Sequence, residues 1–308
     1  MQRCGVRFHL PFLLAFSLLF SSCGQDRAEA PARVGAGQGC VWKVSAKGGG
    51  QLYLCGTIHL LRASDYPLPP AYEAAYADSD ELILELPPGA GSGQELSNRM
   101  RQLGTLPASD SLQALLPERE WKRVAEWSGK RGLDPAVMDR FRPWFVSLLM
   151  VATEYAALGA APDRGVDQFF EDRAAKDGKS GAGLETVEQQ LALFSGMTPE
   201  QEKEVLEQTL AEMATVEAEY ENMIRAWRTG DLEALQELLF REAEHYPDLM
   251  EAFLYRRNRA WVPELEKVLA RGGRAMVLVG AGHLGGELGV LSLLRQKGYE
   301  VTPVVAAP

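Results

Sequence analysis

Residues 40–59, CVWKVSAKGGGQLYLCGTIH, hold the pattern from which the rest of the fold can be worked out. Two runs of alternating apolar residues flank the glycine-rich turn Lys47-Gly48-Gly49-Gly50, which is typical of a β-hairpin. If the turn centres between positions 47 and 48, Cys40 lies opposite Cys55. We therefore treat Cys40 and Cys55 as a disulfide candidate, with two buried free thiols as the alternative.

The segments that follow the hairpin predict an α/β fold. A helix at 69–79 and an apolar strand at 81–86 come next, and this order predicts a βαβ unit with parallel strands. The chain ends in the same way, with a buried strand at 275–279, a helix to about residue 297 and a strand at 300–305. We expect one mixed sheet built from these N- and C-terminal βαβ parts.

A large helical insertion separates the two parts, at about 94–272. Three of its helices are predicted from apolar periodicity, at 117–130, 143–157 and 165–176. The segment Thr198-Pro199-Glu200-Gln201 is a capping box, so a long helix is expected from there to Trp227. The glycine-rich segment 178–185 is expected to hold a short strand.

Composition limits the class of protein. The chain has 308 residues, 46% of them hydrophobic, and a formal net charge of −10. An acidic chain lacks the basic surface that nucleic-acid binding needs, so we expect no nucleic-acid partner. Residues 1–22 have the charged start and short apolar run of a signal peptide. We expect a flexible tether at 23–39 and a single domain at 40–308.

The end of the predicted signal peptide, Phe20-Ser21-Ser22-Cys23, resembles a bacterial lipobox. In that case Cys23 would be lipidated and would become the first residue of the mature chain. Gly24, and not an aspartate, directly follows Cys23, which by analogy with Gram-negative lipoproteins predicts the outer membrane, facing the periplasm. The alternative is cleavage by an ordinary signal peptidase and a secreted protein.

Two histidines end predicted strands in the same local pattern, Gly-x-x-His. They are His59 and His283, and Glu85 lies at the end of the strand at 81–86. Ligand sites of open α/β sheets lie beyond the carboxyl ends of the strands, so these three side chains are expected there. Two imidazoles and a carboxylate suit Zn²⁺, Mn²⁺, Fe²⁺ or Co²⁺. The alternative is two unrelated turn histidines and a solvated glutamate.

These motifs resemble the TraB/GumN family, which is related to the Tiki proteases. The resemblance extends from about Val41 to Val305 and rests on Leu54-Cys55-Gly56-Thr57-Ile58-His59, Leu84-Glu85-Leu86, Gly165-Val166-Asp167, Gly183-Leu184-Glu185-Thr186, Arg257-Asn258 and Val279-Gly280-Ala281-Gly282-His283-Leu284. It implies a fold akin to erythromycin esterase and the ChaN haem-binding lipoproteins, with metal-dependent peptide hydrolysis. By this resemblance the metal-site or catalytic residues are His59, Glu85 and His283, and the supporting residues are Gly56, Gly280, Arg257 and Asn258.

The other polar candidates have simpler explanations. Asp167 and Glu185 sit beside glycines and are interpreted as acids at helix starts, with a supporting role at the site as the alternative. Glu287 is interpreted as part of a solvated helix face, and His245 as a residue at a helix end. The chain contains neither a Gly-x-Ser-x-Gly nucleophile motif nor a phosphate-binding loop.

The expected function is that of a metal-dependent hydrolase, most simply a peptidase, tethered to a bacterial envelope membrane. Its substrate would be a peptide or protein, and its cofactor one divalent metal ion: Zn, Mn, Co or Fe. The main alternative is a lipoprotein on the same fold that binds haem or a peptide without catalysis. A third reading, an ester hydrolase, needs a further histidine near the site.

Overall fold

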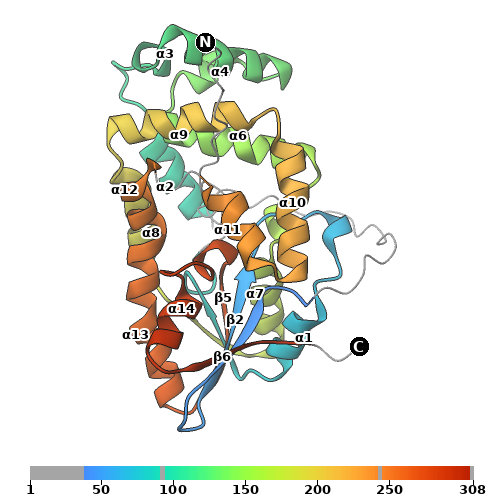
Figure 1. The fold of residues 1–308 in the computed structure, drawn as a ribbon. Coiled ribbons are helices and arrows are strands. Elements are labelled where there is room, and N and C mark those ends of the chain that lie inside the picture. The colour runs from blue at the N-terminus through green and yellow to red at the C-terminus, as the bar shows by residue number, and fades with distance from the viewer. Residues whose placement is uncertain (1–37, 91–93, 242–244, 306–308) are drawn as a thin grey trace, which may run out of the picture.

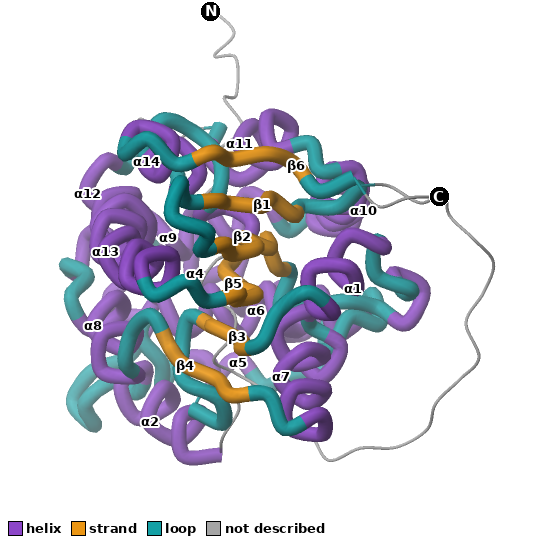
Figure 2. Tube along the Cα trace, turned by 90° about the horizontal axis from the view of Figure 1, so that it is seen from below, coloured by secondary structure: helices purple, strands orange, loops and turns teal. Residues whose placement is uncertain are grey.

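The computed structural model describes residues 38–90, 94–241 and 245–305. Within them a mixed six-stranded sheet is covered by helices on both faces (Figure 1 and Figure 2), which confirms the predicted α/β class. The predicted signal peptide, Cys23 and most of the predicted tether lie outside these residues. The strands are β1 Val41–Ser45, β2 Gln51–Thr57, β3 Glu81–Leu84, β4 Ser180–Gly183, β5 Arg274–Gly280 and β6 Glu300–Pro303.

Most of the helices come between β3 and β5 in the sequence. They are α1 Pro70–Ala77, α2 Gln94–Gly104, α3 Leu112–Leu115, α4 Glu118–Lys130, α5 Pro135–Met138, α6 Pro143–Ala157, α7 Val166–Asp177, α8 Val187–Ser195, α9 Pro199–Glu212, α10 Val216–Thr229, α11 Leu232–Phe240, α12 Pro247–Met250, α13 Arg256–Ala270 and α14 Val290–Gln296. The predicted helical insertion is therefore confirmed, including the short strand β4 within it.

The strand order is β4-β3-β5-β2-β1-β6. Strand β5, from the C-terminal part, lies between β2 and β3 and is parallel to both, and β4 is parallel to β3. Strand β6 pairs antiparallel with β1 at the sheet edge, so it does not neighbour β5 as a simple second βαβ unit would. Both sides of β5 are already occupied by β2 and β3.

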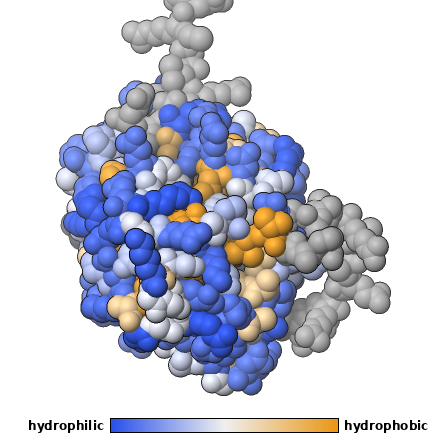
Figure 3. Space-filling view, turned by 60° about the horizontal axis from the view of Figure 1, so that its bottom comes forward, coloured by the Kyte–Doolittle hydropathy of each residue, from blue (hydrophilic) through white to orange (hydrophobic). Residues whose placement is uncertain are grey.

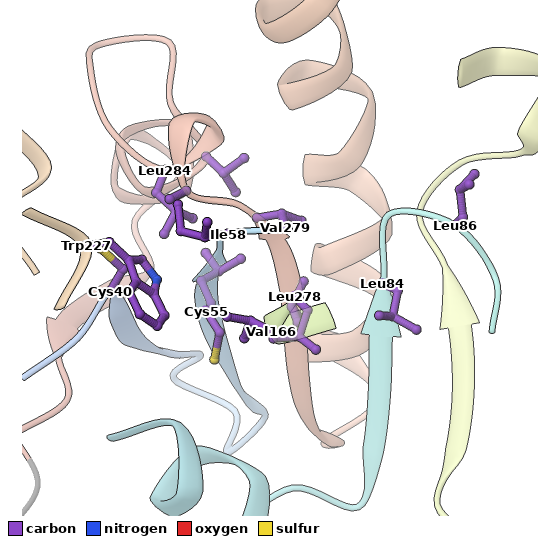
Figure 4. Packing of buried hydrophobic residues seen from close by; sticks show 14 of the residues in the cluster. Cys40, Cys55, Ile58, Leu84, Leu86, Val166, Trp227, Leu278, Val279 and Leu284 are labelled. Carbon is purple, nitrogen blue, oxygen red and sulfur yellow. The ribbon is translucent and has the colours of Figure 1, made fainter. Parts of the chain in front are cut away.

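The hairpin has a register that differs by one residue from the predicted one. Val41 is opposite Cys55, and the backbone N–H of Gly56 donates to Cys40 O at 2.7 Å. Because neighbouring strand residues point to opposite faces, Cys40 and Cys55 do not face each other. Both are buried free thiols, and Figure 4 places Cys40 beside Trp227 and away from Cys55. The disulfide prediction is wrong.

Two helix predictions also need correction. The long helix expected from Thr198 to Trp227 divides into α9 and α10. The backbone N–H of Thr215 donates to the carbonyl of Glu212, three residues back, so the chain makes a tight turn there in place of an α-helical turn. The capping box at its start is present as predicted. The helix expected directly after His283 begins only at Val290, because Gly286 adopts a positive φ of 79° that an α-helix cannot continue through.

Helices α4, α6 and α9 of the insertion form a layer above the carboxyl ends of the parallel strands, whereas α7 and α13 flank the sheet on its two faces (Figure 1 and Figure 2). The main apolar core joins the sheet to the helices on both faces, and a second apolar cluster lies among α3, α4, α5, α6 and α9. Hydrophilic residues predominate on the face drawn in Figure 3, with apolar residues in small groups. In the described part of the chain no helix is long and apolar enough to cross a bilayer.

Candidate active site

Four neighbouring parallel strands deliver polar side chains to one edge of the sheet. Glu185 follows β4, Glu85 follows β3, His283 follows β5 through a short 3₁₀ turn, and His59 follows β2. These residues come together because β5 lies between β2 and β3. The predicted position of the site, beyond the carboxyl ends of the strands, agrees with the structure.

Arg257, from α13, is the centre of this cluster. It donates from Nε and Nη2 to Glu185, from Nη2 to Glu85, and from Nη1 to Phe253 O at 3.1 Å. Its Nη1 also lies 3.0 Å from His283 Nε2. These contacts use all five N–H donors of the guanidinium, so the buried cation is fully satisfied and fixed. Arg257 is a residue that the family resemblance singled out only as supporting.

His283 is held as a neutral ring. The Asn258 side chain donates to Leu288 O at 2.9 Å, so its oxygen faces His283 Nδ1, 2.6 Å away, and accepts the hydrogen there. The Nε2 lone pair then accepts from Arg257. Burial and the nearby Arg257 cation lower the pKa of His283 well below its ordinary value. The Trp261 ring, 4.5 Å away between centroids, covers the imidazole.

Both carboxylate oxygens of Glu85 accept hydrogen bonds. One carboxylate oxygen accepts from the backbone N–H of Gly280 at 2.8 Å. The other accepts from Arg257 and from the Gln190 side chain, 3.2 Å away. The carboxylate thereby ties the β5 turn to β3. Gly280 contributes through its backbone, and no feature of the sequence pointed to Gln190.

His59 differs from His283 because only one of its ring nitrogens has a partner. Its Nδ1 lies 2.6 Å from Asp167 Oδ2, in the first turn of α7. Burial lowers the pKa of His59, but the attraction of Asp167 outweighs burial and raises it above its ordinary value overall. In turn, His59 overcomes burial to lower the pKa of Asp167. Asp167 is therefore more than the helix-terminal acid expected from the sequence.

Close backbone packing places α7 against His59. The N–H of Val166 donates to Ile58 O at 3.1 Å, and a Cβ on Gly165 would lie 2.4 Å from His59 O. Gly56, one of the predicted supporting glycines, is similarly enclosed, since its Cβ would lie 2.9 Å from a methyl of Leu284. Both glycines are required by close approach and not by an unusual φ.

A small cavity lies beside His59, and its volume of about 20 Å³ is room for about one water molecule. His59 Nε2 is a buried atom with no hydrogen-bond partner among the described residues, and it belongs to a ring that lines this cavity. Thr57 also lines the cavity, and its hydroxyl interacts with the Asp167 carboxylate. Buried polar atoms are normally satisfied by protein or water. His59 Nε2 therefore marks a place for a water molecule or for the polar part of a ligand.

The remaining predicted residues lie apart from the cluster. Glu287 is exposed in the turn before α14, outside a helix. His245 is also exposed, in a short turn before α12. The residues that the structure brings together at the strand ends are His59, Glu85, Asp167, Glu185, Gln190, Arg257, Asn258 and His283.

The sequence profile of the TraB/PrgY/gumN family matches residues 40–303. The chain belongs to this family. Among its relatives, the "Uncharacterized protein YbaP" of Escherichia coli strain K12 is 24% identical over 252 residues, which cover 82% of this chain and 90% of YbaP. Metalloprotease TIKI2 of Danio rerio is 25% identical over 304 residues, covering 81% of this chain and 57% of TIKI2. Metalloprotease TIKI1 of Homo sapiens is 26% identical over 192 residues, 53% of this chain and 38% of TIKI1. No solved structure matches the chain.

Two of these relatives are named as metalloproteases. In the described ranges, however, no three His, Cys, Asp or Glu side chains form a metal-binding group. Arg257 donates hydrogen bonds to the Nε2 lone pair of His283 and to the carboxylate of Glu85. Of the three predicted metal ligands, only His59 therefore has a lone pair without a partner among the described residues, at Nε2. As arranged, these residues do not fit a metal ion, and their role as ligands stays a prediction.

Proposed function

We propose that this TraB/PrgY/gumN protein is a hydrolase that cleaves peptide bonds. The observation that carries the proposal is the Nε2 atom of His59, which is buried and unpartnered among the described residues and belongs to a ring that lines the cavity. Asp167 holds the opposite nitrogen of the same ring. A histidine oriented by a carboxylate, with its second nitrogen free, is the arrangement of a general base.

The proposed steps use the residues as they stand. Asp167 can only accept, so the neutral His59 ring carries its hydrogen on Nδ1 and presents a lone pair on Nε2. Nε2 takes a proton from a water molecule in the cavity, and the water oxygen attacks the peptide carbonyl carbon. The imidazolium, stabilised by Asp167, then returns the proton to the departing amine nitrogen.

Cleavage of a peptide library by His59→Ala and Asp167→Asn variants tests the proposal. General-base catalysis is worth about 100- to 10,000-fold, so each variant should lose activity on that scale with unchanged far-UV circular dichroism. His245→Ala is the matched control, because His245 is an exposed histidine away from the cluster. Peptide that is bound but not cleaved by the wild-type chain would overturn the hydrolase proposal in favour of a binding protein.

The pH profile gives a second test. His59 must be neutral to act as the base, so activity should rise with pH through its raised pKa. Removing the charge of Asp167 removes the main attraction that raises this pKa. In Asp167→Asn the acidic limb should therefore move to lower pH, and an unmoved limb would exclude His59 as the base.

The metal dependence that we expect from the sequence is tested in the same assay. None of the steps above goes through a metal ion, so wild-type activity should survive dialysis against a chelator. Activity lost in chelator and restored by Zn, Mn, Co or Fe would overturn the metal-free steps. It would return His59, Glu85 and His283 to the ligand role predicted from the sequence.

We also propose that the chain is held at the outer membrane, facing the periplasm, by a lipid on Cys23. The lipobox-like Phe20-Ser21-Ser22-Cys23 supports this proposal. Labelling with radioactive palmitate should mark the wild-type chain, and Cys23→Ala should abolish both the label and recovery with outer-membrane fractions. A mature chain without lipid would contradict it.

A further inference from the structure

His59 Nε2 is covered in this structure. The atom is buried, and the cavity of about 20 Å³ beside it has room for about one water molecule. A peptide is far larger than a water molecule, so its carbonyl group cannot reach this atom while the cover of the cavity stays in place. The proposed hydrolysis therefore requires one of the elements that line the cavity to move.

Most of these elements are firmly held. The cavity is lined by the ends of β2 and β5 and by one residue each from α6, α10 and α11. The two strands lie inside the sheet, and most residues of α6 are buried. Helix α10 is tied to the chain around β2, because Tyr220 donates to Leu60 O at 3.2 Å and Trp227 donates to Gly56 O at 2.8 Å. Moving any of these elements would disrupt the core or its buried hydrogen bonds.

Helix α11 is held more weakly. Leu235 and Leu239 are its buried residues, and Leu239 supplies its part of the cavity wall. Among the described residues, one hydrogen bond joins α11 to an element other than the neighbouring α10. It runs from Gln236 Nε2 to Gly282 O, at 3.2 Å, in the turn that ends β5 (Figure 1). A segment with few buried residues and few hydrogen bonds to the rest of the fold opens at low cost.

We propose that α11 is a lid, closed in this structure, which moves away from the turn that ends β5 to let a peptide reach His59. The proposal rests on the proposed peptide hydrolysis. Opening breaks the Gln236 hydrogen bond and withdraws Leu239 from the cavity wall, which uncovers the His59 ring. A peptide that binds the open form better than the closed form shifts the population toward the open form.

A disulfide between α11 and the chain after β5 tests the lid during catalysis. A Cβ on Gly285 would lie 2.7 Å from Gln236 Cγ, and the three atoms nearest to this Cβ all belong to the Gln236 side chain. In a Gln236→Cys/Gly285→Cys variant the two Cβ atoms would therefore be at most about 4.2 Å apart, within the roughly 3.5–4.5 Å that disulfides span.

The oxidised variant should cleave peptides about tenfold or more slowly than the same variant reduced with dithiothreitol, because the lid cannot open. Peptide mapping confirms the new disulfide. The wild-type chain, taken through the same oxidation and reduction, is the control and should keep one rate. Equal cleavage by the oxidised and reduced variant would overturn the proposal.

Chemical access to His59 tests the lid independently of the hydrolase. Diethyl pyrocarbonate modifies neutral imidazoles, and mass spectrometry of peptides reports each histidine separately. His59 should react about tenfold or more slowly in the oxidised variant than in the reduced one, whereas the exposed His245 should react equally in both. Equal rates at His59, or no reaction there in the reduced variant, would overturn the lid. Protection of His59 by the disulfide, without peptide cleavage by the wild-type chain, would refute the hydrolase alone.

Single variants keep the lid testable if the disulfide does not form. Gln236→Ala removes the hydrogen bond that holds α11 closed, and one such bond is worth a factor of about 2 to 10 in an equilibrium constant. His59 should then react with diethyl pyrocarbonate about 2- to 10-fold faster. Glu237→Ala is the matched control and should react as the wild type does, because Glu237 is the next residue of α11 and pairs with the adjacent Arg241. An unchanged His59 rate in Gln236→Ala would overturn the proposal.

Discussion

Arg257→Met tests whether the ion cluster at the strand ends stabilises the fold. Methionine has a similar length but donates no hydrogen bond, so Glu85 and Glu185 would keep their buried carboxylates without the guanidinium. Breaking a buried pair from one side costs about 3–5 kcal/mol, because the remaining charge is uncompensated. A native domain is stable by only about 5–15 kcal/mol, so we expect a large fraction of the stability to be lost.

Urea unfolding of the full chain, followed by far-UV circular dichroism, measures this loss. Arg259→Met is the matched control, because Arg259 lies on the same helix but pairs with Glu251 at the surface, where an ion pair is worth about 0–1 kcal/mol. Adding Glu185→Gln to Arg257→Met should restore about 1 kcal/mol or more, since the amide carries no charge to compensate. A loss below about 1 kcal/mol in Arg257→Met, or no recovery in the double variant, would refute the reasoning.

Three further predictions follow from the site and its supports. Gly165→Ala should destabilise the chain by about 1–3 kcal/mol and lower peptide cleavage, because the new Cβ would displace the His59 backbone; an unchanged melting temperature would contradict this. His283 has a lowered pKa, so below its ordinary value of about 6.5 the unfolded chain binds a proton that the folded chain does not. Wild-type stability should therefore fall with decreasing pH relative to His283→Gln, by up to about 1.4 kcal/mol per pH unit, and parallel curves would contradict the neutral ring. Iodoacetamide should leave Cys40 and Cys55 unmodified in the folded chain and should modify both once the chain is unfolded, with no reductant needed, because both are buried free thiols. Peptides joined by a Cys40–Cys55 disulfide would contradict this prediction.

Local signals in the sequence predicted several elements well. The helix expected at 143–157 is α6 with the same bounds, because its proline begins the first turn and its apolar residues are nearly continuous. The capping box at Thr198 starts α9 as expected. The same periodicity could not show that the helix breaks at Thr215, since the apolar stripe continues on both sides. It also could not fix the hairpin register, because a glycine-rich turn accommodates more than one pairing.

The sequence by itself determined which strands end in His59, Glu85 and His283, because the Gly-x-x-His patterns and the apolar runs are local features. Only the tertiary structure decided how these residues differ. Strand β5 enters between β2 and β3, and Arg257 arrives from α13 to occupy the lone pair of His283, while Asp167 leaves His59 Nε2 free. These contacts join residues far apart in the chain, so they depend on strand order and helix packing, which local propensity does not encode.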